Sequence, residues 1–228
     1  GEHALATKTL AVRKPRSMRI RFEGQLPPGV YAKDLILHLI SRFGASGGTG
    51  YAIEFAGSAI RALPIEARFT LCNMAVEFGA WTGIVAPDET TFNYVRGRPF
   101  APGPAIWDQA VAHWRTLVSD ADAVFDREIE IDCTQLGPHI TWGTSPQHGG
   151  NIGDAVPDPA AEPDQNRRQS MQRALDYMGL APGAPLEGLP ISAAFIGSCT
   201  NSRISDLREA ARLLRGHKVA AGVKAICV

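Results

Sequence analysis

The chain has 228 residues, of which 45% are apolar, and its 23 basic and 23 acidic residues leave a formal net charge of zero. This composition is typical of a packed α/β protein and excludes disorder over most of the chain. Balanced charge creates no global field toward nucleic acid or an anionic membrane surface. We therefore expect neither as a partner and predict a small-molecule substrate.

The two ends of the chain bear on location and completeness. No apolar run approaches the roughly 20 residues that span a bilayer, and residues 1–7 have neither the basic nor the apolar region of a signal peptide. A cytoplasmic protein is predicted. The first residue is not methionine, and residues 224–228 have the pattern of a buried strand that is cut short. The sequence thus predicts a fragment, truncated at both ends.

The first predicted elements surround a glycine-rich run. Apolar residues at helical spacing predict a helix over residues 32–43, ended by Gly44 in the left-handed conformation. The run 44–50 then leads into a short apolar strand, 51–55. A dinucleotide-binding loop needs its strand before the glycines and its helix after them, which is the reverse of this order. We therefore favour a flexible turn over a phosphate-binding loop.

Four further elements continue an alternation of helices and strands. Spacing and end signals predict a helix from 64 to 78 that stops at Gly79, a strand 83–86, a helix from 87 to 97 and an amphipathic helix 106–117. Repeated βα units imply a mainly parallel sheet covered by helices. We therefore predict an α/β fold of three layers.

The middle of the chain is less regular. Residues 124–131 alternate apolar and charged side chains, which predicts a half-buried strand whose Glu128 and Glu130 lie on one solvated face. Residues 143–166 are rich in Pro, Gly, Asp and Asn and predict a long loop or interdomain linker. A polar helix is predicted over residues 165–178.

The last predicted unit is a strand, a loop, a helix and a second strand. The strand covers residues 193–196, the loop 197–203 and the helix 206–214, and the second strand begins at Ala225. The loop lies at the carboxyl end of the first strand, where open parallel sheets bind ligands. This loop is therefore a candidate binding site.

The four cysteines are Cys72, Cys133, Cys199 and Cys227, and their wide spacing fits neither a disulfide framework nor a zinc site. Only Cys199 has a suggestive context, between small hydroxyl residues before a helix N-terminus, whose positive end favours a thiolate. Spacing alone leaves a structural turn, a metal ligand and a nucleophile equally open. None of the six histidines carries a local signal of the base that a nucleophile would need.

Asn73 and Glu77 are four residues apart in the predicted helix 64–78 and therefore project from one face of it. Their neighbours on this helix are mostly apolar. An amide and a carboxylate in such a segment are either a paired structural couple or groups of a site, and physical reasoning leaves both open.

Four motifs, at residues 70–80, 85–94, 140–146 and 195–203, resemble the large subunits of bacterial 3-isopropylmalate dehydratase, in the aconitase superfamily. They occur in order and in one register along the whole chain. The segment Pro87-Asp88-Glu89-Thr90-Thr91 points to this family rather than to aconitase itself. Where the family commonly has Asn-Pro-Gly-Gln, this chain has Ser145-Pro146-Gln147-His148.

The resemblance implies roles for four residues. Cys199 would be the first of three cysteine ligands of a 4Fe-4S cluster, the other two arriving in a later C-x-x-C, and Asn201 would lie against the cofactor. Asn73 would lie near the cluster, and Glu77 would hydrogen-bond the iron-bound hydroxyl or water. Three thiolates for four irons leave one iron an open position for a substrate.

The resemblance also implies a reaction and a partner. A 2-hydroxy dicarboxylic acid, 2-isopropylmalate, would lose water to give isopropylmaleate and regain it as 3-isopropylmalate, in leucine biosynthesis, with a small subunit supplying a serine base. Residues 1–186 would form one aconitase-like α/β domain, and 187–228 the start of the cluster-bearing domain. The fragment alone is expected to be inactive. Open alternatives are a sister hydratase for homoaconitate, methylcitrate or citraconate, and a non-catalytic, shortened relative that acts as an interaction module.

Overall fold

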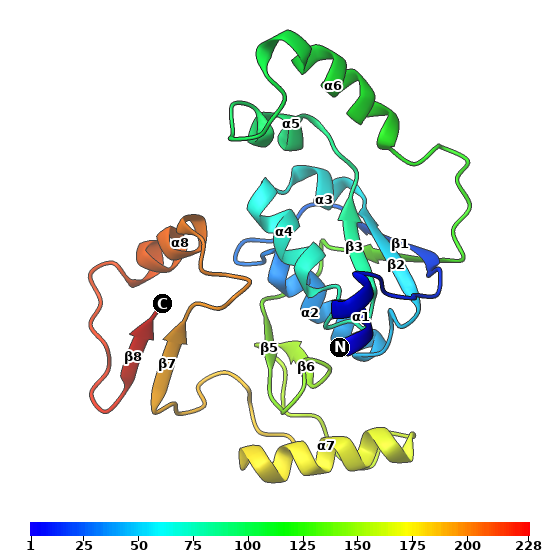
Figure 1. The fold of residues 1–228 in the computed structure, drawn as a ribbon. Helices are drawn as coiled ribbons and strands as arrows, with labels where there is room; N and C mark the ends of the chain where they lie inside the picture. The colour runs from blue at the N-terminus through cyan, green and yellow to red at the C-terminus, as the bar shows by residue number, and fades with distance from the viewer.

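The structure is a computed structural model that describes residues 1–228 (Figure 1). Its α helices are α1 (Glu2–Thr7), α2 (Ala32–Phe43), α3 (Ser58–Ala62), α4 (Ile65–Met74), α5 (Glu89–Val95), α6 (Trp107–Trp114), α7 (Gln165–Met178) and α8 (Ile204–Leu214), with 3-10 turns η1 (Pro104–Ile106), η2 (Arg115–Leu117) and η3 (Pro159–Ala161). Its strands are β1 (Arg16–Glu23), β2 (Tyr51–Ala56), β3 (Thr82–Val85), β4 (Arg127–Asp132), β5 (His139–Thr141), β6 (Gly149–Asn151), β7 (Ala193–Ile196) and β8 (Lys224–Cys227). None of these helices is both long enough and apolar enough to cross a membrane.

Four parallel strands form the central sheet, in the order β3-β2-β1-β4. The mainly parallel α/β architecture predicted from the sequence is therefore confirmed. The predicted elements do not include β1, although Met18, Ile20 and Phe22 alternate in it with polar residues as in any half-buried strand. In the register, Ile20 lies between Phe55 and Ile129, so an apolar row crosses the sheet.

The two faces of this sheet differ. One face shares a core of 24 buried residues with α2, α3 and α4. The opposite face is charged: the Arg19 guanidinium donates to Glu128 (2.9 Å), and Arg21 Nε lies 3.7 Å from a Glu130 oxygen. The solvated face predicted for Glu128 and Glu130 is confirmed. Within residues 1–228 the helices α2, α3 and α4 cover one face of the sheet. A second helical layer on the other face, which the three-layer prediction requires, is not formed by these residues.

The glycine-rich run is a turn that makes room for Phe78. Gly44 ends α2 with a positive φ of 81°, as predicted, but its ψ of 162° is extended rather than left-handed helical. A Cβ on Gly47 would lie 2.2 Å from the Phe78 ring, and the Gly48 N–H donates to the Phe78 carbonyl (2.9 Å). The glycines are needed for this close packing, and the predicted turn into a strand is confirmed.

Replacing Gly47 with alanine should therefore destabilise the fold. The added methyl group must displace the ring of Phe78, which is completely buried, and overpacking of this kind typically costs about 1 to 3 kcal/mol. Urea unfolding followed by circular dichroism measures the change. Gly103→Ala is the matched control, because a Cβ there meets no atom within 4 Å. Equal midpoints for the two variants would contradict the packing role.

The segment predicted to be a linker is irregular but packed. Residues 143–166 contain β6 and η3, and Val156 in this segment is 2% exposed. It lies in a second apolar cluster with Trp142 of the β5–β6 region and Leu175 of α7. The backbone N–H of Val156 also donates to the Ala184 carbonyl (2.8 Å), which holds the segment in place. The Pro and Gly content thus predicts the irregular backbone but not the burial.

The residues at which the chain departs from the family pattern also have a packing role. His148 is 4% exposed, stacks on the Trp142 ring with centroids 5.0 Å apart, and its Nε2 lies 3.2 Å from Ser170 Oγ of α7. Burial lowers the pKa of His148, so its ring is favoured in the neutral form. The Ser145–His148 loop thereby joins α7 to the β5–β6 hairpin (Figure 1).

Helices α5 and α6 form an arm that projects from the sheet (Figure 1). Asp88 starts the arm as the N-cap of α5, accepting from the backbone N–H of Thr90 and Thr91. It also accepts two hydrogen bonds, of 2.7 and 2.8 Å, from the buried guanidinium of Arg68 in α4. Burial raises the pKa of Asp88, but these hydrogen bonds outweigh it and the pKa is lowered overall. The predicted helix start at this position is confirmed.

Candidate functional site

The loop after β7 is shaped by its own polar groups. The hydroxyl of Ser198 accepts from the N–H of Asn201 (2.8 Å) and of Thr200 (3.3 Å), which turns the chain back toward α8. Gly197 has a φ of 131°, and a Cβ there would lie 2.4 Å from the Val228 carbonyl oxygen. The predicted strand-loop-helix-strand unit is confirmed, with β7 and β8 parallel.

This loop rests on α4. The Asn201 amide Nδ2 donates to Thr70 Oγ1 (3.1 Å), and the Arg203 guanidinium donates to the Thr200 carbonyl (2.7 Å) and to the Glu66 carbonyl (3.5 Å). The same guanidinium lies 5.5 Å from the centre of the Phe69 ring. Residues 131 and 137 positions apart in sequence are thus joined through polar contacts.

A second link holds α8 to the start of α2. The Tyr31 hydroxyl hydrogen-bonds a Glu209 oxygen, and Glu209 pairs with Arg212 one turn further along α8. Hydrogen bonds from Arg212 and Tyr31 lower the pKa of Glu209 to about 2, so this carboxylate stays charged at neutral pH. The C-terminal unit is therefore fixed against both α2 and α4 (Figure 1).

The helix predicted over residues 64–78 is shorter than predicted. Its regular part ends at Met74, and turns carry the chain on to Gly79, which has a φ of 91°. There the Ala80 N–H donates to the Ala75 carbonyl (3.0 Å), the six-to-one bond of a Schellman ending. The stop at Gly79 is confirmed, but the uninterrupted helix is wrong, because this ending tightens the last turns.

The shorter helix changes the argument for Asn73 and Glu77. Asn73 lies on α4, seven residues after Glu66 and three after Thr70, so the three share one face of the helix. Glu77 lies in the turns beyond it, and both site candidates are exposed. The structure therefore places Asn73 on the face of α4 that meets the Cys199 loop, with Glu77 beyond the end of that face.

The four thiols fall into a buried pair and an exposed pair, and Cys199 belongs to the exposed one. Burial raises the pKa of Cys72 and of Cys133 to about 11 each, which favours the neutral thiol and disfavours metal ligation. Cys199 and Cys227 are free and exposed. Within residues 1–228 no group of three or more His, Cys, Asp or Glu side chains could hold a metal ion. Any metal at Cys199 must therefore take further ligands from elsewhere.

One polar atom of the loop that carries Cys199 lacks a partner. Asn201 Oδ1 is buried without a hydrogen bond, while its Nδ2 donates to Thr70 and lies 3.4 Å from Asp206 Oδ1. Buried polar atoms are almost always hydrogen-bonded, so this oxygen fits a site that is completed by a group outside the chain. With an exposed thiol two residues away, the arrangement is compatible with one edge of a metal-sulfur site.

Two of the six histidines, His38 and His139, are paired with each other. His38 of α2 and His139 of β5 hydrogen-bond each other through their rings, with His38 Nδ1 3.2 Å from His139 Nε2. The backbone N–H of His139 donates to the carboxylate of the buried Asp34 (2.6 Å). Burial, together with His139 and then Arg42, lowers the pKa of His38 to about 4. His38 thus has a structural role, since the pair joins the central domain to the β5–β6 hairpin.

Stability should fall as the pH is lowered from about 6.5 toward 4. Above this window His38 is neutral in both the folded and the unfolded chain. Within it the unfolded chain binds a proton at His38 that the folded chain does not. The free energy of unfolding therefore falls by up to about 1.4 kcal/mol for each pH unit. Urea midpoints at pH 7 and pH 5 measure the loss. His38→Gln should reduce it, and the exposed His217→Gln should not; an unchanged loss in His38→Gln would contradict the assignment.

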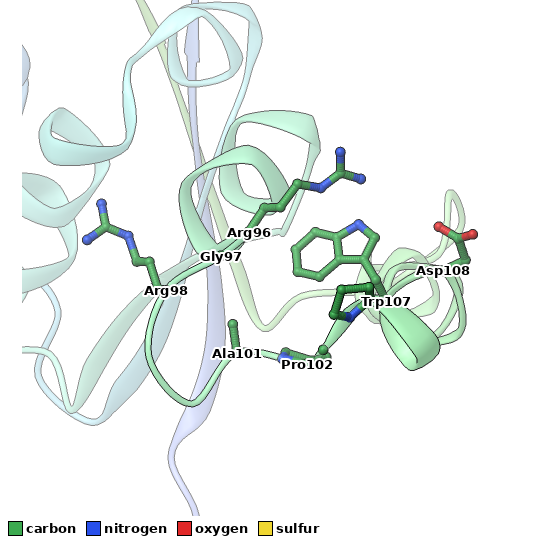
Figure 2. Close-up of a pocket in the computed structure, with 9 residues that line it drawn as sticks. Arg96, Gly97, Arg98, Ala101, Pro102, Trp107 and Asp108 are labelled. Carbon is green, nitrogen blue, oxygen red and sulfur yellow. The ribbon is translucent and has the colours of Figure 1, made fainter.

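A cavity of about 470 Å³ lies apart from these residues, on the arm of α5 and α6 (Figure 2). Trp107 forms one wall, and the Arg96 guanidinium lies 4.9 Å from its ring centre. Figure 2 shows the Arg98 side chain on the other side of the loop, pointing away from Arg96. The cavity contains none of the predicted site residues.

The residues that bring the motifs 70–80 and 195–203 together are not predicted from the sequence. Thr70 and Arg203 stand inside the quoted motifs, but neither has a chemical signature that marks it as a contact. A usable signal was the spacing of Glu66, Thr70 and Asn73, which places a hydroxyl on the same helical face as the predicted amide.

Comparison with known proteins identifies the family of the chain. A family model described as the aconitase family (aconitate hydratase) matches residues 1–228. The 3-isopropylmalate dehydratase large subunit 1 of Bradyrhizobium diazoefficiens is 59% identical over 223 residues, which are 98% of this chain and 47% of that protein. The chain thus spans about half the length of the curated relative that it matches. The resemblance inferred from the four motifs is confirmed, and the chain belongs to the aconitase family.

Proposed function

We propose that the chain is part of a 4Fe-4S-dependent hydro-lyase that isomerises 2-isopropylmalate to 3-isopropylmalate through isopropylmaleate. The observation that carries the proposal is the docking of the Cys199 loop onto α4, the helix that bears Asn73. Family membership and the name of the relative support the reaction. The parallel strand end, the exposed thiol and the unpartnered Asn201 oxygen support a metal-sulfur site.

Each residue has a defined task in this proposal. Cys199 would be one of three thiolate ligands of the cluster, which, when bound, supplies a Lewis-acidic iron. Glu77, in its protonated form, would donate a hydrogen bond to the substrate hydroxyl and give it the proton with which it leaves as water. The amides of Asn73 and Asn201 would orient groups at the same site. The proton on the neighbouring carbon would go to a base outside this chain.

The remaining assignments follow the same resemblance. The partner would be a small subunit that completes the site, and the pathway leucine biosynthesis in the cytoplasm. Residues 1–186 would belong to one aconitase-like domain and residues 187–228 to the cluster-bearing one. The division is supported by the separate β7–β8 sheet, which forms no strand pairs with the central sheet.

The test is to produce the full-length protein with its small subunit anaerobically, count iron and assay 2-isopropylmalate against homoaconitate, methylcitrate and citraconate. We expect about four irons per chain and turnover of 2-isopropylmalate above that of the other acids. Preference for another acid would assign a sister hydratase. An iron-free, inactive complex would overturn the proposal, and residues 1–228 alone should bind no stable cluster.

A further inference from the structure

The contact between Asn201 and Thr70 has a fixed polarity. Asp206 lies on the same side of the Asn201 amide, and its carboxylate can only accept, so the NH₂ group of the amide must face it. Thr70 is 2% exposed, and its hydroxyl donates to the Glu66 carbonyl (3.3 Å), which leaves a lone pair free to accept from the same NH₂ group. Both partners therefore select one orientation of the amide.

That orientation determines where the other end of the amide lies. With Nδ2 held by Thr70 and Asp206, the Oδ1 atom of Asn201 is directed away from both and remains buried without a partner. Without an acceptor at residue 70, the amide would lose one of its two anchors. The amide could then rotate so that its oxygen finds a donor, and the loop would lose a direct tie to α4.

We propose that Thr70 is a positioning residue for the Cys199 loop. Through Asn201 it holds the loop against α4 and presents the unpaired Asn201 oxygen at the site that contains Cys199. Arg203 secures the far end of the loop through the Thr200 and Glu66 carbonyls. The proposal rests on the proposed function to the extent that the group held at Cys199 is the cluster.

The test uses Thr70→Val in the full-length protein with its small subunit, because valine keeps the shape and removes the hydroxyl. We expect faster amide hydrogen exchange at residues 198–203. We also expect the thiolate-to-iron absorbance to be lost in air about ten times faster than in the parent, the lower end of the roughly 10- to 100-fold effect that residues behind the metal ligands have on metal affinity. Thr70→Ser retains the hydroxyl and should behave as the parent. Thr82→Val, at an exposed position in β3, is the matched control.

The outcomes separate this proposal from the function. If the parent carries a cluster and Thr70→Val matches it in exchange and in cluster lifetime, Thr70 has no positioning role while the function stands. Faster exchange with an unchanged cluster lifetime also overturns the proposal. If the parent takes up no iron, the function fails and the role of Thr70 fails with it. Loss of cluster in Thr82→Val to the same degree would show a general effect of threonine loss.

Discussion

Replacing Cys199 with serine in the full-length enzyme should remove the cluster and lower turnover of 2-isopropylmalate by about 10³-fold or more, because Lewis-acid stabilisation is worth several kcal/mol and each 1.36 kcal/mol is a factor of ten. The hydroxyl is a poor replacement for a thiolate as a ligand of iron in such clusters. The fold should be unaffected, since Cys199 is exposed and its Sγ has one weak contact, with Thr200 Oγ1 at 3.8 Å. Iron content, visible absorbance and turnover measure the effect.

Cys227→Ser is the matched control for this variant. Both cysteines are free, exposed and located at the carboxyl ends of paired parallel strands, so they differ chiefly in their surroundings. We expect Cys227→Ser to retain iron and activity. A full cluster in Cys199→Ser would show that Cys199 is not a ligand, and loss of iron in both variants would point to a general defect of the β7–β8 unit.

Replacing Glu77 with glutamine should lower kcat by about 10² to 10⁴, the range typical of a positioned acid or base. Glutamine has nearly the same shape but cannot hold the proton. Iron content should remain at the parent level, because Glu77 lies outside the loop that carries Cys199. Steady-state assays with 2-isopropylmalate and with isopropylmaleate should both show the loss, since hydration is the reverse of the same step.

Glu187→Gln is the control, because this glutamate is also exposed and lies outside the candidate site. It should leave kcat and KM unchanged. A Glu77→Gln variant with parent kcat would remove Glu77 from the chemistry. A variant whose KM rises while kcat is constant would assign Glu77 to binding alone.

Local signals predict some elements to the residue. The helix predicted at 165–178 has the same bounds as α7, since Asp164 caps its start by accepting from the Arg167 N–H and Gly179 ends it in the left-handed conformation. Because a cap contacts only the neighbouring turn of the helix, the local sequence is enough to predict where such a helix begins and ends. The start of α5 at Glu89, which Asp88 caps, lies within two residues of the predicted start for the same reason.

Elements that depend on distant partners are predicted less well. The turns after Met74 follow from the need to place Phe78 in the space left by Gly47, some 30 residues earlier in the chain. The burial of Val156 within a Pro- and Gly-rich segment depends on Trp142 and α7. Neither partner can be identified from the periodicity of the segment itself, which reports only on its local backbone.

The sequence by itself determined the parallel α/β class, the helix and strand ends that are capped locally, and, through four motifs, the aconitase family and its candidate residues Asn73, Glu77, Cys199 and Asn201. Only the tertiary structure decided that the Cys199 loop docks on α4 through Thr70 and Arg203, and that Glu77 lies beyond the regular helix. The physical reason is that a hydrogen bond between residues 131 positions apart leaves no periodic trace in the sequence. Its geometry exists only once the sheet and helices have been packed.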